Sequence, residues 1–388
     1  MLAHSPPLPL TIDYRSDHGI TAEDEEGILF ALEQRHRVRH IRLVSPVQSL
    51  RKLIMAIDKE FPILEYLIVD PPMKDSTALM LPETLQTPNL HHLMLRGFAS
   101  PIRSRLHPTA VDLVKLSLIT NNVSAYFQPK TLLQCISLMP QLEILAILFT
   151  FPFPNRDVEK LTHAPITTYI TLPNLRFIWF QGVSAYLEEV ICRITTPRLE
   201  NLQIWFFKQL TFSVPRLVQF MNTTENLRFN DALIIFQDKQ IHLLMHLREA
   251  GTFPFGVTVD CGQLDWQVSS VAQISNALSQ VFSAVDHLIL KHDVHGRSSD
   301  ERNDVDRIEW RKLLGSFSNV KTLRFDNGLV EELSHCLRLG DGEPPLELLP
   351  ELQQLAYSGS YNTGDAFTSF IDARQNAGRP VALRLFYG

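Results

Sequence analysis

One short pattern recurs along most of this chain and limits the folds open to it. It reads Pro-x-Leu-x-x-Leu-x-Leu, as in "TPNLHHLMLRG", "MPQLEILAIL", "TLPNLRFIWFQG", "TPRLENLQIWF" and "LPELQQLAYSG". The first apolar residue of each copy, here named the box residue, is Val38, Leu64, Leu90, Leu113, Leu142, Leu175, Leu199, Val285, Val320 or Leu352. Most steps between box residues span about 23 to 35 positions, which is typical of a chain built by stacking one unit.

Each copy predicts a short strand, because apolar residues alternate with other residues after the second leucine. The preceding proline indicates that the strand begins directly after a loop. Apolar residues at helical spacing lie between the boxes, in residues 49–61, 184–194, 303–317 and 364–378. The long gap between Leu199 and Val285 leaves room for two degenerate copies, around Leu227 and Val257.

Strand then helix, repeated about eleven times, predicts parallel strands side by side with helices outside them. The expected fold class is α/β, a curved leucine-rich-repeat-like solenoid with a parallel sheet on the concave side, helices on the convex side and irregular repeats. We expect one domain over residues 1–388, with an N-terminal strand and helix cap (1–36), repeats (37–360), and a C-terminal helix and strand cap (361–388). The alternative is a doubly wound α/β domain, whose strands would be continuous apolar runs.

Composition indicates a soluble, folded, intracellular protein, either cytoplasmic or nuclear. Hydrophobic residues make up 45% and charged residues 20% of the chain, and the net charge is −6, which gives no support for binding nucleic acid or a membrane surface. The four cysteines form no C-x-x-C pair, as suits a reducing compartment. No apolar run is long enough to span a bilayer, and the N-terminus lacks the features of a signal peptide. We expect a monomer.

Several strings resemble the F-box/leucine-rich-repeat-like proteins of mushroom-forming fungi. They are "SPPLPLTIDY", "RVRHIRL", "LPETLQTPNLHHLMLRG", "LPNLRFIWFQG", "FSNVKTLRF", "LLPELQQLAYSG" and "FTSFIDARQNAGRPV". The resemblance implies a substrate receptor of a cullin-RING ubiquitin ligase, whose F-box docks a Skp-type adaptor. No F-box is found in this sequence, so we expect that adaptor only if an F-box lies upstream. "LPETLQ", from Leu81, begins like an F-box but runs directly into a predicted strand.

A second departure from strong leucine-rich repeats concerns asparagine. The asparagine expected after the box, which satisfies backbone groups in the turn, is represented only by Asn121. Without such an asparagine in every copy, we expect irregular curvature and variable loops.

No nucleotide-binding, hydrolase, zinc-protease or kinase motif is present. His242 and His246, four apart, are expected on one helix face with Glu249 nearby, and we interpret them as structural or exposed. His287, His292, Asp293 and His295 end another box, and a solvated loop is the simpler interpretation than a metal site. Adjacent His335 and Cys336 on one helix point in different directions. We therefore expect no enzyme, no cofactor and no metal; the alternative is an active site assembled from loops between repeats.

Residues between the box leucines are expected on the concave face, because side chains alternate along a strand. The middle copies offer apolar and aromatic residues there, and the outer copies offer charged ones. An exposed apolar patch with Trp and Arg is typical of an interaction site. The predicted protein-binding residues are Arg96, Ile144, Leu148, Phe177, Trp179, Trp205 and Arg324, with Trp179 the strongest candidate, beside Trp205 of the next copy.

The alternative for this face is that a loop, such as residues 149–160, folds over it. The predicted function is a non-catalytic protein-interaction module with an unknown partner, the substrate-recognition part of an F-box-type receptor that lacks its F-box. The alternative is a stand-alone leucine-rich-repeat scaffold with no role in ubiquitin transfer.

Overall fold

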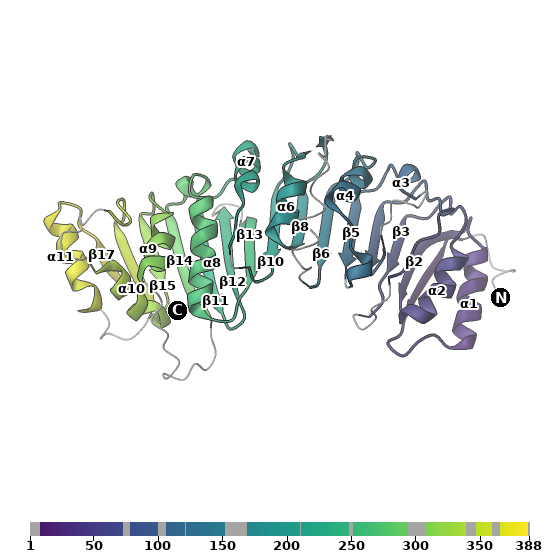
Figure 1. The fold of residues 1–388 in the computed structure, drawn as a ribbon, viewed down its shortest axis with the longest axis horizontal. Helices are drawn as coiled ribbons and strands as arrows, with labels where there is room; N and C mark the ends of the chain where they lie inside the picture. Colours follow the sequence, from purple (N-terminus) through teal and green to yellow (C-terminus); the bar gives the residue numbers. More distant parts are fainter. Residues whose placement is uncertain are drawn as a thin grey trace. The chain divides into compact units, whose positions relative to one another are not determined.

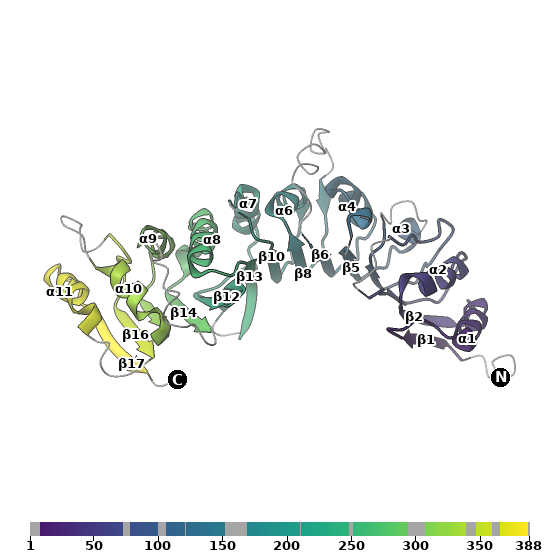
Figure 2. The ribbon, with the colours of Figure 1, turned by 60° about the horizontal axis from the view of Figure 1, so that its bottom comes forward.

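The computed structural model describes residues 8–72, 78–99, 106–120, 122–151, 169–209, 211–247, 251–293, 307–338, 347–358 and 365–386. The fold is mixed α/β, and its strands are mostly parallel. Contacts divide the chain into two compact units, Met1–Glu200 and Asn201–Gly388. Within each unit the helices lie on one side of the strands (Figure 1, Figure 2). The single domain expected over residues 1–388 stays a prediction.

The first unit alternates strands with helices along the chain. Its elements are β1 (Leu10–Arg15), α1 (Ala22–Glu33), β2 (Val38–Val44), α2 (Val47–Ala56), β3 (Tyr66–Val69), β4 (His92–Arg96), α3 (Leu106–Thr109), β5 (Lys115–Thr120), η3 (Val123–Ala125), α4 (Pro129–Ile136), β6 (Ile144–Phe149), β7 (Ile170–Thr171), β8 (Phe177–Gly182), α6 (Ser184–Ile191) and β9 (Ile194–Thr195). Seven of these strands pair in parallel in the order β1-β2-β3-β4-β5-β6-β8. The short β7 and β9 form a separate parallel pair.

The strands of the first unit bury one set of alternate side chains under the helices. In β3, for example, Leu67 and Val69 are buried while Tyr66 is exposed. Val38 begins β2, every other box residue lies two positions before its strand, and each is at most 2% exposed. The helix predicted from the pattern around Leu50, Leu53 and Ile54 is α2, and all three of these residues are buried. The period-2 strand prediction and the period-3.6 helix prediction are both confirmed here.

The recurring proline has a local structural explanation. The box residue donates its backbone N–H to the carbonyl three positions earlier, from Leu90 to Thr87 at 3.2 Å and from Leu175 to Leu172 at 3.3 Å. The proline, such as Pro173, takes the second position of this four-residue turn, where a fixed φ suits the turn and no N–H is needed. The same bond recurs at Leu64, Leu113, Leu142, Leu199, Leu227, Val285, Val320 and Leu352. We name this element the box turn.

Asparagine in the third position of the box turn links neighbouring copies. Asn174 Nδ2 donates to the carbonyl of Pro140 at 3.3 Å, and Asn319 Nδ2 donates to the carbonyl of Ser283 at 2.7 Å. Asn89 Nδ2 donates to the carbonyl of Pro62 in the same way. These amides satisfy carbonyls in the box turn of the preceding copy. Asparagines before the strand therefore take over part of the role expected of asparagines after it. Asn121, the one asparagine expected after a box, lies outside the described residues.

The second unit contains β10 (Asn201–Phe206), α7 (Pro215–Thr223), β11 (Asp231–Gln237), β12 (Gln240–Leu247), β13 (Thr252–Asp260), α8 (Leu264–Ala277), η4 (Val281–Ala284), β14 (His287–Asp293), α9 (Arg307–Gly315), β15 (Thr322–Phe325), η5 (Asn327–Leu329), α10 (Val330–Leu337), β16 (Gln354–Ser358), α11 (Thr368–Asn376) and β17 (Ala382–Phe386). Its strands pair in the order β10-β13-β12-β11-β14-β15-β16-β17. The predicted helices over 303–317 and 364–378 correspond to α9 and α11, and Gly378 follows α11 with φ +74°.

The region between Leu199 and Val285 corrects the expectation of uniformly parallel strands. Strands do form after Leu227, as β11, and around Val257, as β13. Between them lies β12, which pairs antiparallel with both. β13 pairs parallel with β10 and β11 pairs parallel with β14, so the spatial order departs from the chain order. Two residues, Asp238 and Lys239, join β11 to β12, and a connection this short forces the chain to reverse direction.

The helix expected at His242 and His246 is wrong, because both residues lie in β12. A spacing of four fits one face of a helix, but it also fits one face of a strand, where side chains repeat every second residue. The intervening residues decide between the two. Ile241, Leu243 and Met245 are buried, whereas Leu244 on the other face is only partly so, which is the alternation of a strand.

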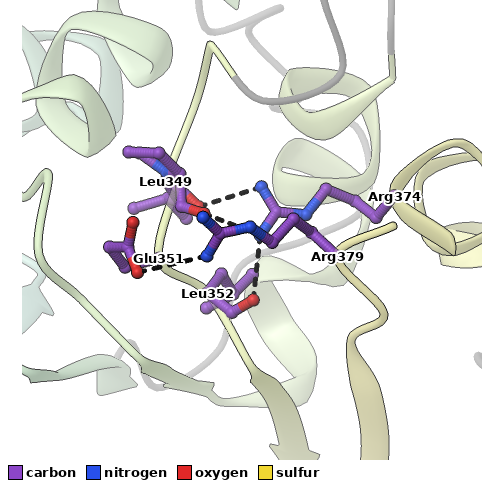
Figure 3. Close-up of polar contacts among 6 residues, drawn as sticks. Leu349, Glu351, Leu352, Arg374 and Arg379 are labelled. Carbon is purple, nitrogen blue, oxygen red and sulfur yellow. Dashed lines mark hydrogen bonds and ion pairs between the residues drawn. The ribbon is translucent and has the colours of Figure 1, made fainter. Parts of the chain in front are cut away.

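The last box turn of the chain is held by a buried arginine (Figure 3). Arg374 of α11 is fully buried and donates to the carbonyls of Leu349 at 3.2 Å, Pro350 at 3.1 Å and Leu352 at 2.9 Å. Burial lowers the pKa of Arg374 from its ordinary value. Leu349 has φ +50°, a strained conformation for a leucine. Arg374 thus stabilises a strained turn through three charge-assisted hydrogen bonds.

Candidate functional site

The predicted contact residues of the first unit meet on the face of the sheet that carries no helices. Ile144 and Leu148 lie on β6, and Phe177 and Trp179 lie on the neighbouring β8. Ile144 is paired with Phe177, and Trp179 lies across from Ala146. These four large side chains, which we name the apolar patch, are therefore brought together by the pairing of two strands.

Strand β8 presents its two aromatic residues to solvent because its other residues fill the core. Ile178 and Phe180 are buried at 4% and 1% exposure, while Phe177 and Trp179 are 39% and 51% exposed. The run of aromatic and β-branched residues favours an extended strand, and alternation then fixes which side chains face outward. The outward orientation predicted for Trp179 is confirmed. Whether a partner contacts it stays a prediction.

A charged rim borders the apolar patch at the start of β8. The guanidinium of Arg176 forms a two-pronged bond with Glu200, at 3.0 Å from Nε to Oε1 and 2.8 Å from Nη2 to Oε2. The same guanidinium lies 5.8 Å from the ring centroid of Phe177. The hydrogen bond to Glu200 and the charge of Glu200 raise the pKa of Arg176. The apolar patch thus has a polar border next to an aromatic centre, an arrangement common in protein interfaces.

The same sheet face carries a row of rings on β2, β3 and β4. His40, Tyr66 and His92 lie opposite one another in register. The ring centroids of Tyr66 and His92 are 4.2 Å apart in an edge-on arrangement, and those of His40 and Tyr66 are 5.4 Å apart. Burial, together with the nearby charge of Lys115, lowers the pKa of His92 to about 4. His92 is therefore neutral near pH 7.

Cations outnumber carboxylates on the helix-free face from β2 to β5. Arg42, Arg96 and Lys115 lie there, with Asp70 at the end of β3 as the opposing carboxylate. We name these three cations the basic stretch. Arg96, a predicted contact residue, has its Nε 2.6 Å from Asp70 Oδ1, so its charge is largely engaged. Arg42 and Lys115 make no ion pair with any described residue, and Arg42 Nε is buried without a hydrogen-bond partner.

The remaining predicted contact residues, Trp205 and Arg324, belong to the second unit. Trp205 on β10 is half-buried, and its Nε1 donates to Asp260 Oδ1 at 2.7 Å. Arg324 on β15 is exposed, and its guanidinium carbon lies 3.5 Å from the ring centroid of Phe386 on β17. Both side chains are thus engaged within their own unit, whereas Trp179 is half-exposed.

Sequence reasoning missed a polar network on β10, β11, β12 and β13. His242 Nδ1 lies 2.9 Å from Thr258 Oγ1, and His242 Nε2 lies 3.0 Å from Gln237 Oε1. Burial raises the pKa of Asp260 and lowers that of His242. The alternation of β12 places His242 on the helix-free face, a signal that a spacing of four between histidines does not distinguish from a helix. Because these groups satisfy one another, the network supports the antiparallel insertion.

The buried cysteines are poorly suited to nucleophilic chemistry. Burial raises the pKa of Cys135, Cys261 and Cys336 to about 12, so the reactive thiolate is scarce near neutral pH. Among the described residues, no group of three or more His, Cys, Asp or Glu side chains could hold a metal ion. Glu249 and His295, considered with the histidine groups, lie outside the described residues, as does most of the loop considered as a cover, residues 152–160.

Comparison with models of known protein families and with curated proteins gives no match to this chain. Within the part of the chain that the structure describes, every helix is too short or too polar to cross a bilayer.

Proposed function

We propose that this chain is a non-catalytic module that binds another protein on the helix-free sheet face of its first unit. The observation that carries the proposal is the apolar patch, with Phe177 and Trp179 exposed side by side with Ile144 and Leu148. Exposed aromatic residues on a rigid strand lose little conformational freedom on binding, and tryptophan is enriched among residues that dominate interface energetics. The polar border at Arg176 and Glu200 supports the same interpretation.

The finer architecture that fits this function is a leucine-rich-repeat-like curved solenoid, with the sheet concave and the helices convex. Recurrent box turns, buried box residues and a helix after most strands support it. In that arrangement the apolar patch lies on the concave surface, where repeat proteins commonly bind their partners.

The proposed lineage is the substrate-recognition part of an F-box-type ubiquitin-ligase receptor. Its support is the resemblance of the sequence strings given above, such as "LPNLRFIWFQG" and "FTSFIDARQNAGRPV". The alternative is a stand-alone scaffold of the same fold with no role in ubiquitin transfer. In both cases the apolar patch is the binding surface, so one set of variants tests the shared proposal.

The test compares three proteins, the wild-type chain, Trp179→Ala and Trp266→Ala, by quantitative affinity capture with the full chain. Trp266 lies on α8 and is 37% exposed, so the control removes a similar exposed ring from a helix. Loss of a central aromatic contact costs about 2 kcal/mol or more, a reduction in affinity of roughly thirtyfold. A specific partner is expected to be lost with Trp179→Ala and kept with Trp266→Ala. Equal recovery of every partner by all three proteins would refute the proposal.

The lineage is tested separately, in the same experiment, by the Skp-type adaptor. Capture of the adaptor by the full-length product of the gene, together with a Trp179-dependent partner, would support a ubiquitin-ligase receptor. Capture of the Trp179-dependent partner without the adaptor would favour the stand-alone scaffold.

A further inference from the structure

The charges beside the apolar patch narrow the chemistry of its partner, an inference that rests on the proposed function. The chain as a whole carries a net charge of −6, yet the sheet face from β2 to β5 has three cations against the single carboxylate of Asp70. His92 adds no positive charge to this face near pH 7, because burial and the charge of Lys115 lower its pKa to about 4. The basic stretch therefore gives this face more cations than carboxylates, although the chain as a whole is acidic.

Neither Lys115 nor Arg42 makes an ion pair with a described residue, although the charge of Arg42 acts on the carboxylate of Asp70, as the charge of Arg96 does. Lys115 is flanked in register by His92 and Ile144, neither of which can neutralise it. Arg42 lies across from Asp13, but that carboxylate is 3.7 Å from Arg15 Nε. Arg42 Nε is enclosed without a hydrogen-bond partner. An incoming anion therefore cannot reach Nε, but it can pair with the terminal nitrogens of this guanidinium.

We propose that the apolar patch and the basic stretch together bind one linear segment of a partner protein, an acidic peptide with a large apolar anchor. The anchor lies on Phe177 and Trp179, and its carboxylates face Lys115 and Arg42. The segment crosses the strands, since the charged and apolar positions lie on successive strands of the sheet.

The spacing of the sheet sets the spacing of the peptide. Neighbouring strands are about 4.8 Å apart, so Lys115 on β5 lies roughly 10 Å from Phe177 on β8, which an extended chain covers in about three residues. Arg42 on β2 is three strands farther and, in register with Ser117, two residues along the strand direction, so it lies roughly 16 Å from Lys115, or about five more residues. The expected motif is an apolar residue, an acidic residue about three positions away, and a second acidic residue about five positions beyond.

Acidic side chains at the rim limit where the carboxylates can lie. Glu143 and Arg176 directly precede β6 and β8, and the carboxylate of Glu200 forms an ion pair with Arg176. This border gives an anion no net attraction next to the anchor. The attraction is confined to the β2–β5 side, which gives the bound peptide a direction.

The experiment selects peptides from a displayed library of random twelve-residue sequences, using the purified full chain as bait. Selected peptides are expected to combine a Trp, Phe or Leu with Asp or Glu at the spacings above. Lys115→Glu is expected to weaken their binding roughly tenfold, as measured by fluorescence anisotropy, and added salt is expected to weaken wild-type binding. Lys130→Glu on α4 is the control, since it makes the same charge change at an exposed helical position of the same unit.

A second variant at Lys115 distinguishes a loss of binding caused by the charge from one caused by misfolding. Lys115→Gln keeps the aliphatic stem and is expected to show a smaller loss than Lys115→Glu, with an unchanged circular dichroism spectrum. Trp179→Ala is expected to abolish binding of the same peptides.

The outcomes separate this inference from the proposed function. Selected peptides that need Trp179 but show no acidic preference would refute the inference and leave the protein-binding function standing. Peptides that depend on neither Trp179 nor Lys115 would refute both. A library that yields no enriched peptide, or a labelled single-stranded oligonucleotide that binds in a Lys115-dependent way, would also overturn the inference.

Discussion

At the scale of single residues, the chain uses polar side chains to hold its backbone in place. Arg374 is fully buried, and its guanidinium donates to three neutral carbonyls of one turn. Asn174 and Asn319 act in the same way at the surface, each donating to a carbonyl of the preceding copy. In both cases a side chain satisfies backbone groups that the strand ladder leaves open, as buried polar groups require.

Replacing Arg374 with Met is expected to lower the free energy of unfolding by about 3 kcal/mol, because three turn carbonyls lose a charged donor. The control is Arg379→Met. Arg379 makes an exposed ion pair with Glu351, at 3.5 Å, and its loss is expected to cost under about 1 kcal/mol. Urea denaturation measures both variants, and hydrogen exchange at the amides of β16 and α11 locates the effect. Equal destabilisation by both variants would contradict the role assigned to Arg374.

His92 is expected to make stability fall as pH decreases. Its pKa is near 6.5 in the unfolded chain and about 4 in the fold, so the fold favours the neutral ring. The stabilisation is complete above pH 6.5 and is lost as pH falls from 6.5 to about 4, by up to about 3 kcal/mol.

The check on His92 is the urea midpoint of His92→Phe at several pH values. This variant keeps an aromatic ring beside Tyr66 and is expected to show a flatter pH dependence than the wild type. His91→Phe, at the neighbouring exposed position, is the control and is expected to follow the wild type. An NMR titration that places the pKa of His92 near 6.5 would contradict the expectation.

At the scale of elements, the box turn is the unit that the sequence repeats. The backbone bond from the box residue to the carbonyl three positions earlier is present in nearly every copy, whether or not proline precedes it. Phe317, Ser318, Asn319 and Val320 form the turn without proline. The hydrogen bond and the buried box residue are therefore the constant features, and proline is an aid to the same geometry.

The asparagine of the box turn is expected to contribute measurably to stability. Asn319→Ala removes the 2.7 Å bond to Ser283 and is expected to lower the free energy of unfolding by about 1 kcal/mol. Ser318→Ala changes the adjacent exposed residue of the same turn and is expected to change stability by less than about 0.5 kcal/mol. Chemical denaturation of both variants tests this, and a loss in Ser318→Ala equal to that in Asn319→Ala would count against the bridge.

At the scale of the whole molecule, the four tryptophans sample very different environments. Trp310 is 1% exposed and Trp205 is half-buried, whereas Trp266 and Trp179 are 37% and 51% exposed. Intrinsic fluorescence therefore separates the core from the surface without any label.

Trp179→Phe is expected to remove the largest share of the emission that acrylamide quenches. Trp266→Phe is expected to remove a smaller share, and Trp310→Phe is expected to leave the quenchable share unchanged. The measurement is steady-state quenching of each purified variant in its folded state. A Trp179→Phe protein that is quenched like the wild type would show that the apolar patch is covered in solution.

Much of the fold could be predicted because the same strand pattern recurs in many copies along the chain. Leu67, Leu93 and Leu116 occupy equivalent buried positions, so alternation in one copy supports the reading of the next. The outward position of Trp179 follows from the same alternation. The insertion at β12 could not be predicted this way, because it occurs once and because a spacing of four fits both a strand and a helix.

The contact partners of Trp205 and Arg324 were also beyond sequence reasoning. Asp260 lies in a strand that pairs with β10 only because of the inserted β12, so no local pattern links it to Trp205. Phe386 reaches Arg324 from β17 near the end of the described chain. Such pairings depend on spatial order, which periodicity along the sequence does not contain.

The reversed strand order in the second unit has a consequence for synthesis on the ribosome. β10 and β11 follow each other along the chain, yet β13 is the strand that pairs with β10. Until β13 has left the exit tunnel, that edge of β10 has no native neighbour. Unpaired strand edges readily join other chains. A nascent chain stalled between these two strands therefore exposes this edge of β10 to pairing with other chains.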